Sequence, residues 1–411
     1  MKELPRRVLI IVQNLPVPFD RRVWLEATTL QRAGYHVTVV CPKLKGLNAS
    51  KEVIEDVEIH RYGLPVTARG VLGYLVEFSW CFVRTFVKSI RIALWGRGFD
   101  VIHACNPPET YWVLGLFWRL AGKRFLFDHH DLSPEVYAAK FGGPHGLLYR
   151  TLTFLERMTF KAADVVITTN ESHRRVALER GGVPSDRVFI VRSGPDLNRF
   201  KQYPAEDAWR RGKQFLIAYL GEIGVQDGVE NLVRAVRVLR DDLQRTDFHC
   251  VLVGGGPHAE VVRGLAEREG VMDLCTFTGD VTDDGILCRI LSSADLAVVP
   301  DPKTTHSDKS TMNKVVEYMF FGLPIVAFDL SENRFSAGSA GSYVHGSSPA
   351  DLARRVQELL NDPARRAAMS RTGRERVRDL LAWEHSVPHL LAAYEKVFEG
   401  LASGPGVRKA S

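Results

Sequence analysis

Residues 310–328 read STMNKVVEYMFFGLPIVAF, and this stretch predicts a helix, a glycine stop and a buried strand in that order. Asp308 or Ser310 can cap the start of the helix, because their side chains accept hydrogen bonds from the first free backbone N–H groups. Gly322 suits the left-handed residue past the last turn, and Pro324 cannot continue a helix. We therefore expect a helix of about three turns followed directly by a strand.

The two faces of this helix differ in chemistry. Its apolar residues fall on one stripe, whereas Asn313, Lys314 and Glu317 share another face, since residues three and four apart are neighbours on a helix. The N–H groups at the helix start, around Ser310 and Thr311, suit a phosphate, and Lys314 adds a positive charge one turn in. Glu317 lies further along, at a distance that suits the hydroxyls of a ribose. The alternative is that Glu317 is a solvated helix residue.

Residues 317–326, EYMFFGLPIV, resemble the donor-binding signature of the retaining glycosyltransferases of family four. In that family a helix ending Glu-Tyr/Ala-Met-x-x-Gly-x-Pro-Ile/Val-Val holds the ribose of a nucleotide sugar, so the resemblance implies this role for Glu317. The signature usually has a second glutamate eight residues earlier, where this chain has Lys309. Residues 308–319 are similar to a subgroup that reads Asp-Lys/Arg-Ser-x-x-Asn-Lys-x-x-Glu-Tyr-Met.

The composition is that of a globular protein with room for two domains: 411 residues, 45% of them hydrophobic and 25% charged. A net charge of +6 favours anionic partners, but the charge is spread over the chain, which disfavours nucleic acid. Six scattered cysteines predict reduced core thiols. No apolar run has the length of a signal-peptide core or a membrane span, so we expect a cytoplasmic protein, with the inner face of the membrane as a second location.

The N-terminal half begins with a strand–helix–strand unit of a parallel sheet, over residues 8–12, 21–33 and 37–41. The loop before the helix follows the first strand, where open α/β sheets bind ligands, so Arg21 and Arg22 are candidates for a phosphate or an anionic acceptor. The alternative is a helix capped by Asp20 with two solvated arginines. The run FDRRVWLEA in this region resembles the same subgroup.

Residues 71–96 predict a basic, aromatic-rich amphipathic helix. Such a helix packs against a core with its lysine and arginine ends in solvent, or it lies on an anionic membrane. We expect the core arrangement for most of this helix, with membrane contact at its rim as the alternative.

Two further strands, in residues 100–108 and 124–135, end in polar residues that point to a ligand-binding edge. The first ends near Asn106, an acceptor candidate, and the second in the run Asp128-His129-His130-Asp131. Spacing alone does not distinguish metal ligands from an acid/base couple here. The family places the histidine of a His-Asp pair beside the donor sugar, which implies that role for His130 with Asp131; His129 and Asp128 are the next candidates.

The C-terminal half starts a second parallel sheet after a polar linker over 197–214. Gly221 and Gly224 flank its first strand-to-helix turn and would let the backbone approach a diphosphate, as would Gly254 after the next strand. The family usually has a basic residue immediately before the glycine at the end of this loop, Gly228 here, and this chain has Gln226 and Asp227 instead. Lys309 or Lys314 is then the nearest source of positive charge. By resemblance, backbone groups around Val281 hold the nucleobase.

The predicted fold is α/β of the GT-B type, with two doubly wound Rossmann-like domains facing each other across a cleft. We expect an acceptor-side domain (1–198), a nucleotide-sugar-binding domain (199–382), a closing helix that returns to the first domain (383–400) and a disordered tail (401–411).

The expected function is retaining transfer of a sugar from a nucleoside-diphosphate sugar to a saccharide or lipid-linked acceptor in polysaccharide or glycoconjugate biosynthesis. A non-hydrolysing sugar-nucleotide epimerase and a catalytically silent nucleotide-binding subunit are the alternatives. We expect no metal and no cofactor, because a helix end with lysines can neutralise the leaving diphosphate.

Overall fold

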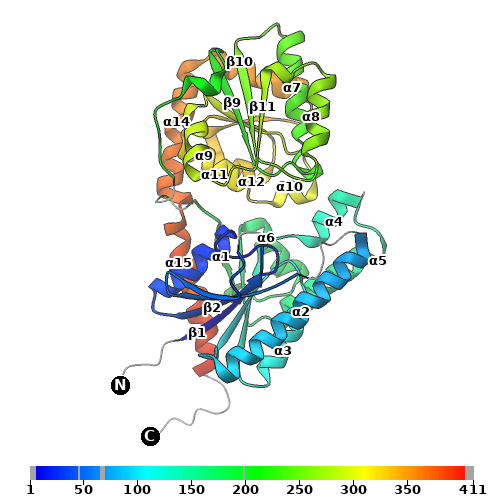
Figure 1. Cartoon of the computed structure of the whole chain (residues 1–411), viewed down its shortest axis with the longest axis vertical. Coiled ribbons are helices and arrows are strands. Elements are labelled where there is room, and N and C mark those ends of the chain that lie inside the picture. Colours follow the sequence, from blue (N-terminus) through cyan, green and yellow to red (C-terminus); the bar gives the residue numbers. More distant parts are fainter. Residues whose placement is uncertain are drawn as a thin grey trace. The chain divides into compact units, whose positions relative to one another are not determined.

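The computed structural model describes residues 6–44, 47–64, 70–141, 143–195, 197 and 200–402, and it divides into two compact units (Figure 1). Unit 1 comprises Met1–Ala138, Pro144–Arg192 and Ser386–Ser411, and unit 2 comprises Ala139–Gly143 and Ser193–His385. The main division thus falls at Arg192/Ser193, a few residues before the predicted boundary at 198/199. The part of the predicted tail from residue 403 onwards lies outside the described residues.

Unit 1 is built on an eight-stranded sheet in the order β3-β4-β2-β1-β5-β6-β7-β8. All neighbouring strands are parallel except the edge pair β3–β4. The strands are β1 (Arg7–Ile11), β2 (His36–Pro42), β3 (Lys51–Ile54), β4 (Val57–Tyr62), β5 (Val101–Cys105), β6 (Arg124–His129), β7 (Val165–Thr168) and β8 (Val188–Ile190).

Seven α-helices contribute to unit 1 in the described part of the chain. They are α1 (Arg21–Arg32), α2 (Gly70–Trp95), α3 (Trp112–Arg119), α4 (Ser133–Phe141), α5 (Gly146–Ala162), α6 (Glu171–Arg175) and, from Ser386 on, α15 (Trp383–Ala402). Asp20 caps α1 by accepting a hydrogen bond from the backbone N–H of Val23, as one of the two sequence alternatives had it. The hydroxyl of Tyr394 on α15 lies 2.8 Å from Nδ1 of His103 on β5, so the last helix is fixed to the central strand.

Unit 2 contains a six-stranded parallel sheet in the order β11-β10-β9-β12-β13-β14. Alternate residues of β9 enter two apolar clusters: Ile217 and Tyr219 belong to one, Leu216 and Ala218 to the other. Both faces of the sheet are therefore buried, which explains why its strands are continuous apolar runs. The strands are β9 (Phe215–Leu220), β10 (Phe248–Val253), β11 (Cys275–Gly279), β12 (Leu296–Val299), β13 (Ile325–Phe328) and β14 (Gly341–Val344).

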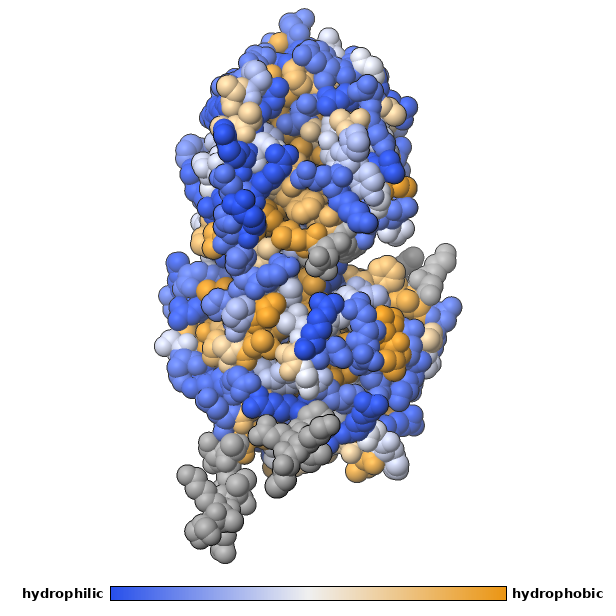
Figure 2. All heavy atoms as spheres, turned by 90° about the vertical axis from the view of Figure 1, so that its left-hand side faces the viewer, coloured by the Kyte–Doolittle hydropathy of each residue, from blue (hydrophilic) through white to orange (hydrophobic). Residues whose placement is uncertain are grey.

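The helices of unit 2 cover these two faces (Figure 1). They are α7 (Val229–Asp241), α8 (Ala259–Arg268), α9 (Asp284–Ser293), α10 (Thr305–Lys309), α11 (Asn313–Phe320), α12 (Ser331–Ala337), α13 (Pro349–Asn361) and α14 (Pro363–Arg376). Hydrophilic side chains occupy most of the molecular face shown in Figure 2, with hydrophobic ones in small groups between them.

The organising helix is shorter than predicted. A separate short helix, α10, ends at Lys309 just before this stretch, and α11 begins only at Asn313, where the capping residue Met312 makes no capping hydrogen bond with its side chain. Asp308 does not cap it: its carboxylate accepts from the backbone N–H of Ser331 at 2.8 Å and so holds the start of α12. Ser310 ends α10 and donates its hydroxyl to the carbonyl of His306. Gly322 follows α11 with a φ of 73°, as expected for its left-handed position.

Candidate functional site

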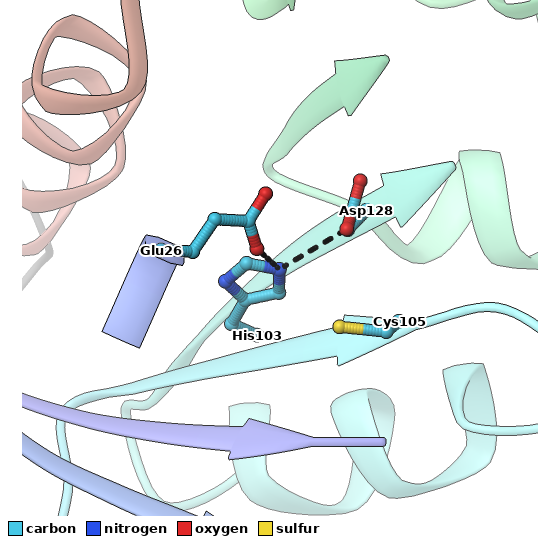
Figure 3. A group of neighbouring side chains, drawn as sticks. All are labelled: Glu26, His103, Cys105 and Asp128. Atoms are coloured by element: carbon cyan, nitrogen blue, oxygen red, sulfur yellow. Dashed lines mark ion pairs between the residues drawn. The ribbon is translucent and has the colours of Figure 1, made fainter. Parts of the chain in front are cut away.

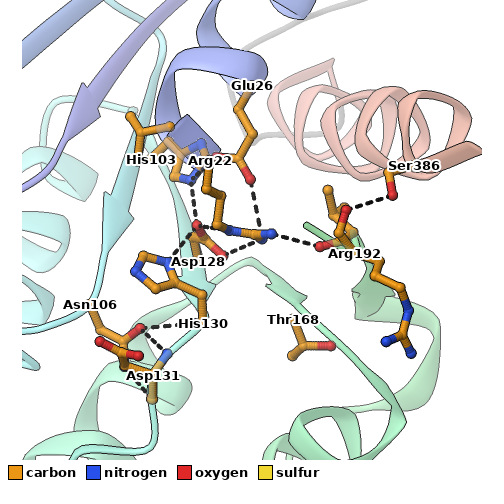
Figure 4. A network of polar contacts seen from close by, with 12 residues as sticks. Arg22, Glu26, His103, Asn106, Asp128, His130, Asp131, Thr168, Arg192 and Ser386 are labelled. Atoms are coloured by element: carbon orange, nitrogen blue, oxygen red, sulfur yellow. Dashed lines mark hydrogen bonds and ion pairs between the residues drawn. The ribbon is translucent and has the colours of Figure 1, made fainter. Parts of the chain in front are cut away.

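A carboxylate–histidine pair of unit 1 lies at the carboxyl end of β6. Asp128 is the second-to-last residue of that strand, and His130 follows its end. Oδ2 of Asp128 is 2.9 Å from Nδ1 of His130 (Figure 4). Asp128 is fully buried, whereas 13% of the His130 side chain is exposed. One ring nitrogen of His130 is therefore held by Asp128, and a small part of the imidazole is exposed.

Asn106, at the end of β5, holds the backbone of this loop. Its Oδ1 accepts hydrogen bonds from the N–H groups of His130 and Asp131 at 2.9 and 3.1 Å, and its Nδ2 donates to the carbonyl of Asp131 at 2.6 Å and to Glu109 at 3.0 Å. The side chain is completely buried. Asn106 is thus a support for the His130 loop, and its predicted role as an acceptor-binding residue does not fit this burial.

Arg22 is also used internally. Its guanidinium donates to both oxygens of Asp128 at 2.7 and 2.9 Å and to the carbonyl of Val191 at 2.7 Å, and it lies 3.1 Å from Glu26 (Figure 4). The side chain is 8% exposed, so neither predicted role, phosphate ligand or solvated arginine, describes it. The neighbouring Arg21 is exposed.

His129 is not a catalytic residue in this arrangement, although its position beside His130 suggested one. Side chains alternate between the faces of a strand, so His129 points away from Asp128 and His130. Its imidazole is fully buried, lies 3.1 Å from Glu156 and packs against the ring of Phe160 at 4.8 Å between centroids. A buried imidazole with these partners serves the core of unit 1.

The charges of this network shift one another's pKa values. Burial would raise the pKa of Asp128, but the positive charges of Arg22 and His130 outweigh it and hold that pKa well below its usual range. Burial would lower the pKa of His130, but the Asp128 carboxylate outweighs it and raises that pKa to about 9. Burial raises the pKa of Glu26 to about 8 in spite of Arg22. At neutral pH His130 is therefore a cation paired with Asp128.

Four potential metal ligands, Glu26, His103, Cys105 and Asp128, have ligand atoms within 4.8 Å of one another (Figure 3). Their chemistry fits a metal poorly. Arg22 already binds both oxygens of Asp128, which leaves a positive charge where an ion would sit. Burial raises the pKa of the Cys105 thiol well above its ordinary value, so the thiolate that binds metals is disfavoured.

In unit 2 the structure brings Lys314 to the first glycine turn. Its Nζ pairs with Asp301, at 2.9 Å from Oδ2 and 3.2 Å from Oδ1, and lies 4.9 Å from the centre of the Tyr219 ring. A Cβ placed on Gly221 would be 3.6 Å from Nζ. Burial would lower the pKa of Lys314, but Asp301 outweighs it and the pKa is raised. The lysine is thus a cation at the carboxyl end of β9.

The glycines of this region serve the protein's own backbone first. A Cβ on Gly254 would lie 2.0 Å from the carbonyl oxygen of Gly221, so glycine is needed where these two turns touch. Gly224 donates its N–H to the carboxylate of Asp227 at 2.9 Å, and a Cβ there would also meet Gln226. Burial raises the pKa of Asp227 to about 6. Asp227 therefore closes the turn and supplies no positive charge for a phosphate.

Glu317 lies on α11, one turn beyond Lys314, and is 7% exposed, so it is not the solvated residue of the alternative interpretation. The next residue, Tyr318, accepts a hydrogen bond from the N–H of Leu220 at 2.6 Å and fixes the helix to the end of β9. The remaining predicted donor-site residues are exposed or partly exposed; they are Lys309, Ser310, Thr311, Asn313 and Val281. Within the described residues, Gly221 lies close to both Lys314 and Gly254, and Gln226 lies close to Gly224.

Comparison with known proteins decides the family. The family model described as "Glycosyl transferase 4-like domain" matches residues 20–194, and the one described as "Glycosyl transferases group 1" matches residues 214–362. The chain belongs to the family four glycosyltransferases. This glycosyltransferase has the GT-B fold, and the matched ranges contain both His130 and Glu317.

Three known proteins illustrate the similarity. A 2-deoxystreptamine glucosyltransferase of Streptomyces kanamyceticus is 27% identical to the glycosyltransferase over 289 residues, which cover 68% of this chain and 72% of the relative. The structure of sucrose-phosphate synthase from Thermosynechococcus elongatus has a TM-score of 0.77 at 22% identity, covering 96% of this chain and 99% of that chain. Anabaena HepE, solved in complex with UDP and glucose, has a TM-score of 0.69 at 15% identity, covering 97% and 99%.

Sequence reasoning missed several residues of the glycosyltransferase's two networks. Glu26 lies in the run FDRRVWLEA and His103 in the strand that precedes Asn106, but only the fold brings Glu26 and His103 to the Arg22–Asp128 pair and Tyr394 to His103. Asp301 carried a usable signal, because it follows a buried strand at the edge where the polar residues gather.

Proposed function

We propose that this glycosyltransferase moves a hexosyl group from a nucleoside-diphosphate sugar to a saccharide or lipid-linked acceptor, with retention of configuration, in polysaccharide or glycoconjugate biosynthesis. The observation that carries the donor assignment is the position of Lys314, a cation beside the glycine turn that follows β9. A diphosphate needs such a cation, because burying its charge without a partner is costly.

The donor site proposed for unit 2 runs along α11. Lys314 and the backbone at Gly221 bind the diphosphate, and Glu317, one helical turn further, accepts the ribose hydroxyls. A bound diphosphate would compete with Asp301 for the ammonium group of Lys314. The crystal of the fold relative HepE holds UDP and glucose, which supports a nucleotide as the ligand class.

Unit 1 contributes His130 to the reaction in this proposal. Because Nδ1 of the ring is held by Asp128, the other ring nitrogen is left to donate a hydrogen bond to the donor sugar. The acceptor hydroxyl then attacks the anomeric carbon on the face from which the diphosphate departs, and Lys314 stabilises the charge that develops on the leaving oxygen. We propose that neither a metal nor a cofactor takes part.

The first test is donor binding by Glu317 variants. Glu317→Ala removes a charge-assisted hydrogen bond to the ribose and should weaken UDP binding by about 1.5–3 kcal/mol in a calorimetric titration, with Glu317→Gln milder. Glu267→Ala, at an exposed position of α8, is the matched control and should bind UDP normally. Normal binding by Glu317→Ala would show that the ribose assignment is wrong.

The epimerase and the silent subunit are separated from the transferase by acceptor dependence. With labelled donor and an acceptor mixture, a transferase labels the acceptor, an epimerase changes the sugar without acceptor, and a silent subunit binds the nucleotide only. The family assignment favours the first result.

We further propose that the acceptor is reached at an anionic membrane surface that contacts α2. Within the described residues no helix is long and apolar enough to cross a bilayer, so such contact would be peripheral. Five exposed apolar residues at helical spacing form what we name the α2 stripe; they are Val76, Trp80, Val83, Val87 and Leu94, with 38–66% of each exposed. The predicted core arrangement holds only for the opposite side of α2, where Cys81, Thr85, Ser89 and Ile92 are buried.

Charge beside the α2 stripe favours anionic lipid as its partner. Arg84, Lys88 and Arg91 recur at the same helical spacing and lie next to the stripe. A second group of exposed apolar residues on α3 adjoins it, because Phe86 of α2 packs edge-on against Phe117 of α3 at 5.0 Å. An apolar surface flanked by cations fits the headgroup region of a negatively charged bilayer.

Co-sedimentation with vesicles tests this surface. The wild type should sediment with phosphatidylglycerol-containing vesicles and much less with phosphatidylcholine alone. The triple variant Val76→Ser/Val83→Ser/Val87→Ser should stay in the supernatant, whereas the control Val53→Ser/Val261→Ser, at exposed positions elsewhere, should behave as wild type. Failure of the wild type to sediment, or a dimer in light scattering that the triple variant abolishes, would contradict the membrane assignment.

A further inference from the structure

Arg22 occupies the centre of the polar network in unit 1 (Figure 4). It is the second residue of α1, and its guanidinium uses all three of its nitrogens: Nε and one terminal nitrogen donate to the two oxygens of Asp128, and the other terminal nitrogen donates to the carbonyl of Val191. The second carboxylate, Glu26, lies 3.1 Å away on the same helix. A planar fork bound in this way has one orientation.

This contact fixes the carboxylate that holds His130. Oδ2 of Asp128 lies 2.9 Å from Nε of Arg22 and 2.9 Å from Nδ1 of His130, while Oδ1 of Asp128 lies 2.7 Å from Arg22. With both oxygens held, the carboxylate cannot rotate without breaking a charged hydrogen bond. The orientation of the imidazole then follows from that of the carboxylate, as it does where a carboxylate orients a histidine elsewhere.

The third bond of Arg22, to Val191, connects the network to two of the places where the chain changes units. Val191 immediately precedes Arg192, the last residue of unit 1 before the chain enters unit 2. The carbonyl of Arg192 accepts a hydrogen bond at 2.8 Å from the hydroxyl of Ser386, the residue at which the chain returns to unit 1 (Figure 4). The crossings at Arg192 and at Ser386 are thus linked, through two consecutive carbonyls, to the guanidinium that holds Asp128.

We propose that Arg22 is a positioning residue of the transfer reaction: anchored by the Val191 carbonyl, its guanidinium fixes Asp128 and thereby aims the His130 imidazole at the donor sugar. The inference rests on the proposed role of His130. It replaces the role of phosphate or acceptor ligand that the sequence suggested for this arginine. Arg22 itself, buried beneath the loop, acts through Asp128 and His130.

Replacing Arg22 with lysine separates the effect of its positive charge from the effect of its forked geometry. Arg22→Lys keeps a positive charge near Asp128, but a single ammonium nitrogen cannot bind both carboxylate oxygens and Val191 in the same plane. We expect kcat to fall by roughly 10- to 100-fold while KM for the donor changes less than about twofold, because misaimed catalytic groups lower the rate more than the binding. The control is Arg32→Lys. Arg32 lies on the same helix as Arg22 and forms an exposed ion pair with Glu55, so this change should alter neither kcat nor KM.

A double-mutant cycle with His130→Ala separates the positioning role of Arg22 from the proposed role of His130 on which it rests. If Arg22 acts through His130, the Arg22→Lys change should lower kcat in the wild-type background and have little further effect in the His130→Ala background. Additive losses, or an unchanged kcat of folded Arg22→Lys, would overturn the positioning role. Full activity of His130→Ala would instead refute the proposed role of His130.

A measurement that does not depend on activity completes the test. In NMR spectra of the folded protein, Arg22→Lys should shift the ring nitrogen signals of His130 and leave those of His249, in unit 2, in place; unshifted His130 signals would overturn the inference. If Arg22→Lys does not fold, Asp128→Asn carries the same test, because it keeps the shape of the side chain and removes its charge. Its kcat should fall with KM preserved, and an unchanged kcat would overturn the inference.

Discussion

Two buried cation–carboxylate pairs, Arg22 with Asp128 in unit 1 and Lys314 with Asp301 in unit 2, look alike but differ in how fully the cation is used. The Arg22 guanidinium donates from all three nitrogens, to Asp128 and to the backbone at Val191. The Lys314 ammonium pairs with one carboxylate and lies over the ring of Tyr219. A forked guanidinium with several partners is fixed, whereas an ammonium on a flexible stem can exchange one anion for another.

The residues around the two pairs show the same difference between a fixed cation and an exchangeable one. Arg22 lies between two buried carboxyl groups, Glu26 and Asp128, so its loss would leave the charge of Asp128 buried without that cation. Lys314 lies beside Gly221, where the absence of a side chain leaves the ammonium next to backbone. The comparison teaches that a cation predicted from sequence to bind phosphate must be judged by its existing partners. It supports the proposals that Lys314 binds the ligand and that Arg22 positions Asp128.

The largest expected effect is on the stability of unit 1. Arg22→Met leaves Asp128 and Glu26 buried without their cation and should lower the free energy of unfolding by about 3–5 kcal/mol. Arg32→Met, which breaks only the exposed pair with Glu55, should stay within about 0.5 kcal/mol of the wild type. Chemical denaturation measures both. Equal, small losses would show that the Arg22 network does not stabilise the fold and would remove one side of the comparison.

A pH dependence follows from the raised pKa of His130. The pKa lies near 6.5 in the unfolded chain and rises to about 9 in the folded protein, because Asp128 outweighs the effect of burial. The stabilisation is therefore complete below pH 6.5 and is lost as the pH rises through 9. Over this interval the free energy of unfolding of the wild type should fall by up to about 3 kcal/mol more than that of His130→Gln.

The matched control for this titration is His345→Gln. His345 pairs with Asp329 but is 83% exposed, so its replacement should leave the pH profile of the wild type unchanged. Parallel profiles for the wild type and His130→Gln would show that the Asp128–His130 pair contributes no stability.

The fold was largely predictable from the sequence, because buried parallel strands leave a simple signature. Runs such as residues 215–220 are apolar on both faces, and each is followed by a helix, which indicates the doubly wound architecture. The β3–β4 hairpin was missed: it lies at a sheet edge, half of its residues are polar, and its turn uses Glu55 and Asp56 at positive φ without a glycine.

The site was predictable only where the chain itself fixes the geometry. His130 became a candidate because it follows a strand, and its role stays a prediction. Its neighbour His129 was misassigned because the direction in which each side chain points depends on the register of β6. The partners of Arg22 and Lys314 come from distant strands, and no local pattern shows that Asp128 or Asp301 will meet them. Which cation remains available to a ligand is therefore a property of the folded chain.

Calorimetric titration of UDP into Lys314→Met and Arg22→Lys tests the central claim, that Lys314 binds the diphosphate and Arg22 does not. Methionine keeps the helix propensity of lysine, so the first variant removes the charge with α11 intact. We expect Lys314→Met to lose about 1–3 kcal/mol of binding free energy, and Lys309→Met and Arg22→Lys to bind UDP as the wild type does. Unchanged affinity in Lys314→Met, or an equal loss in Arg22→Lys, would contradict the account.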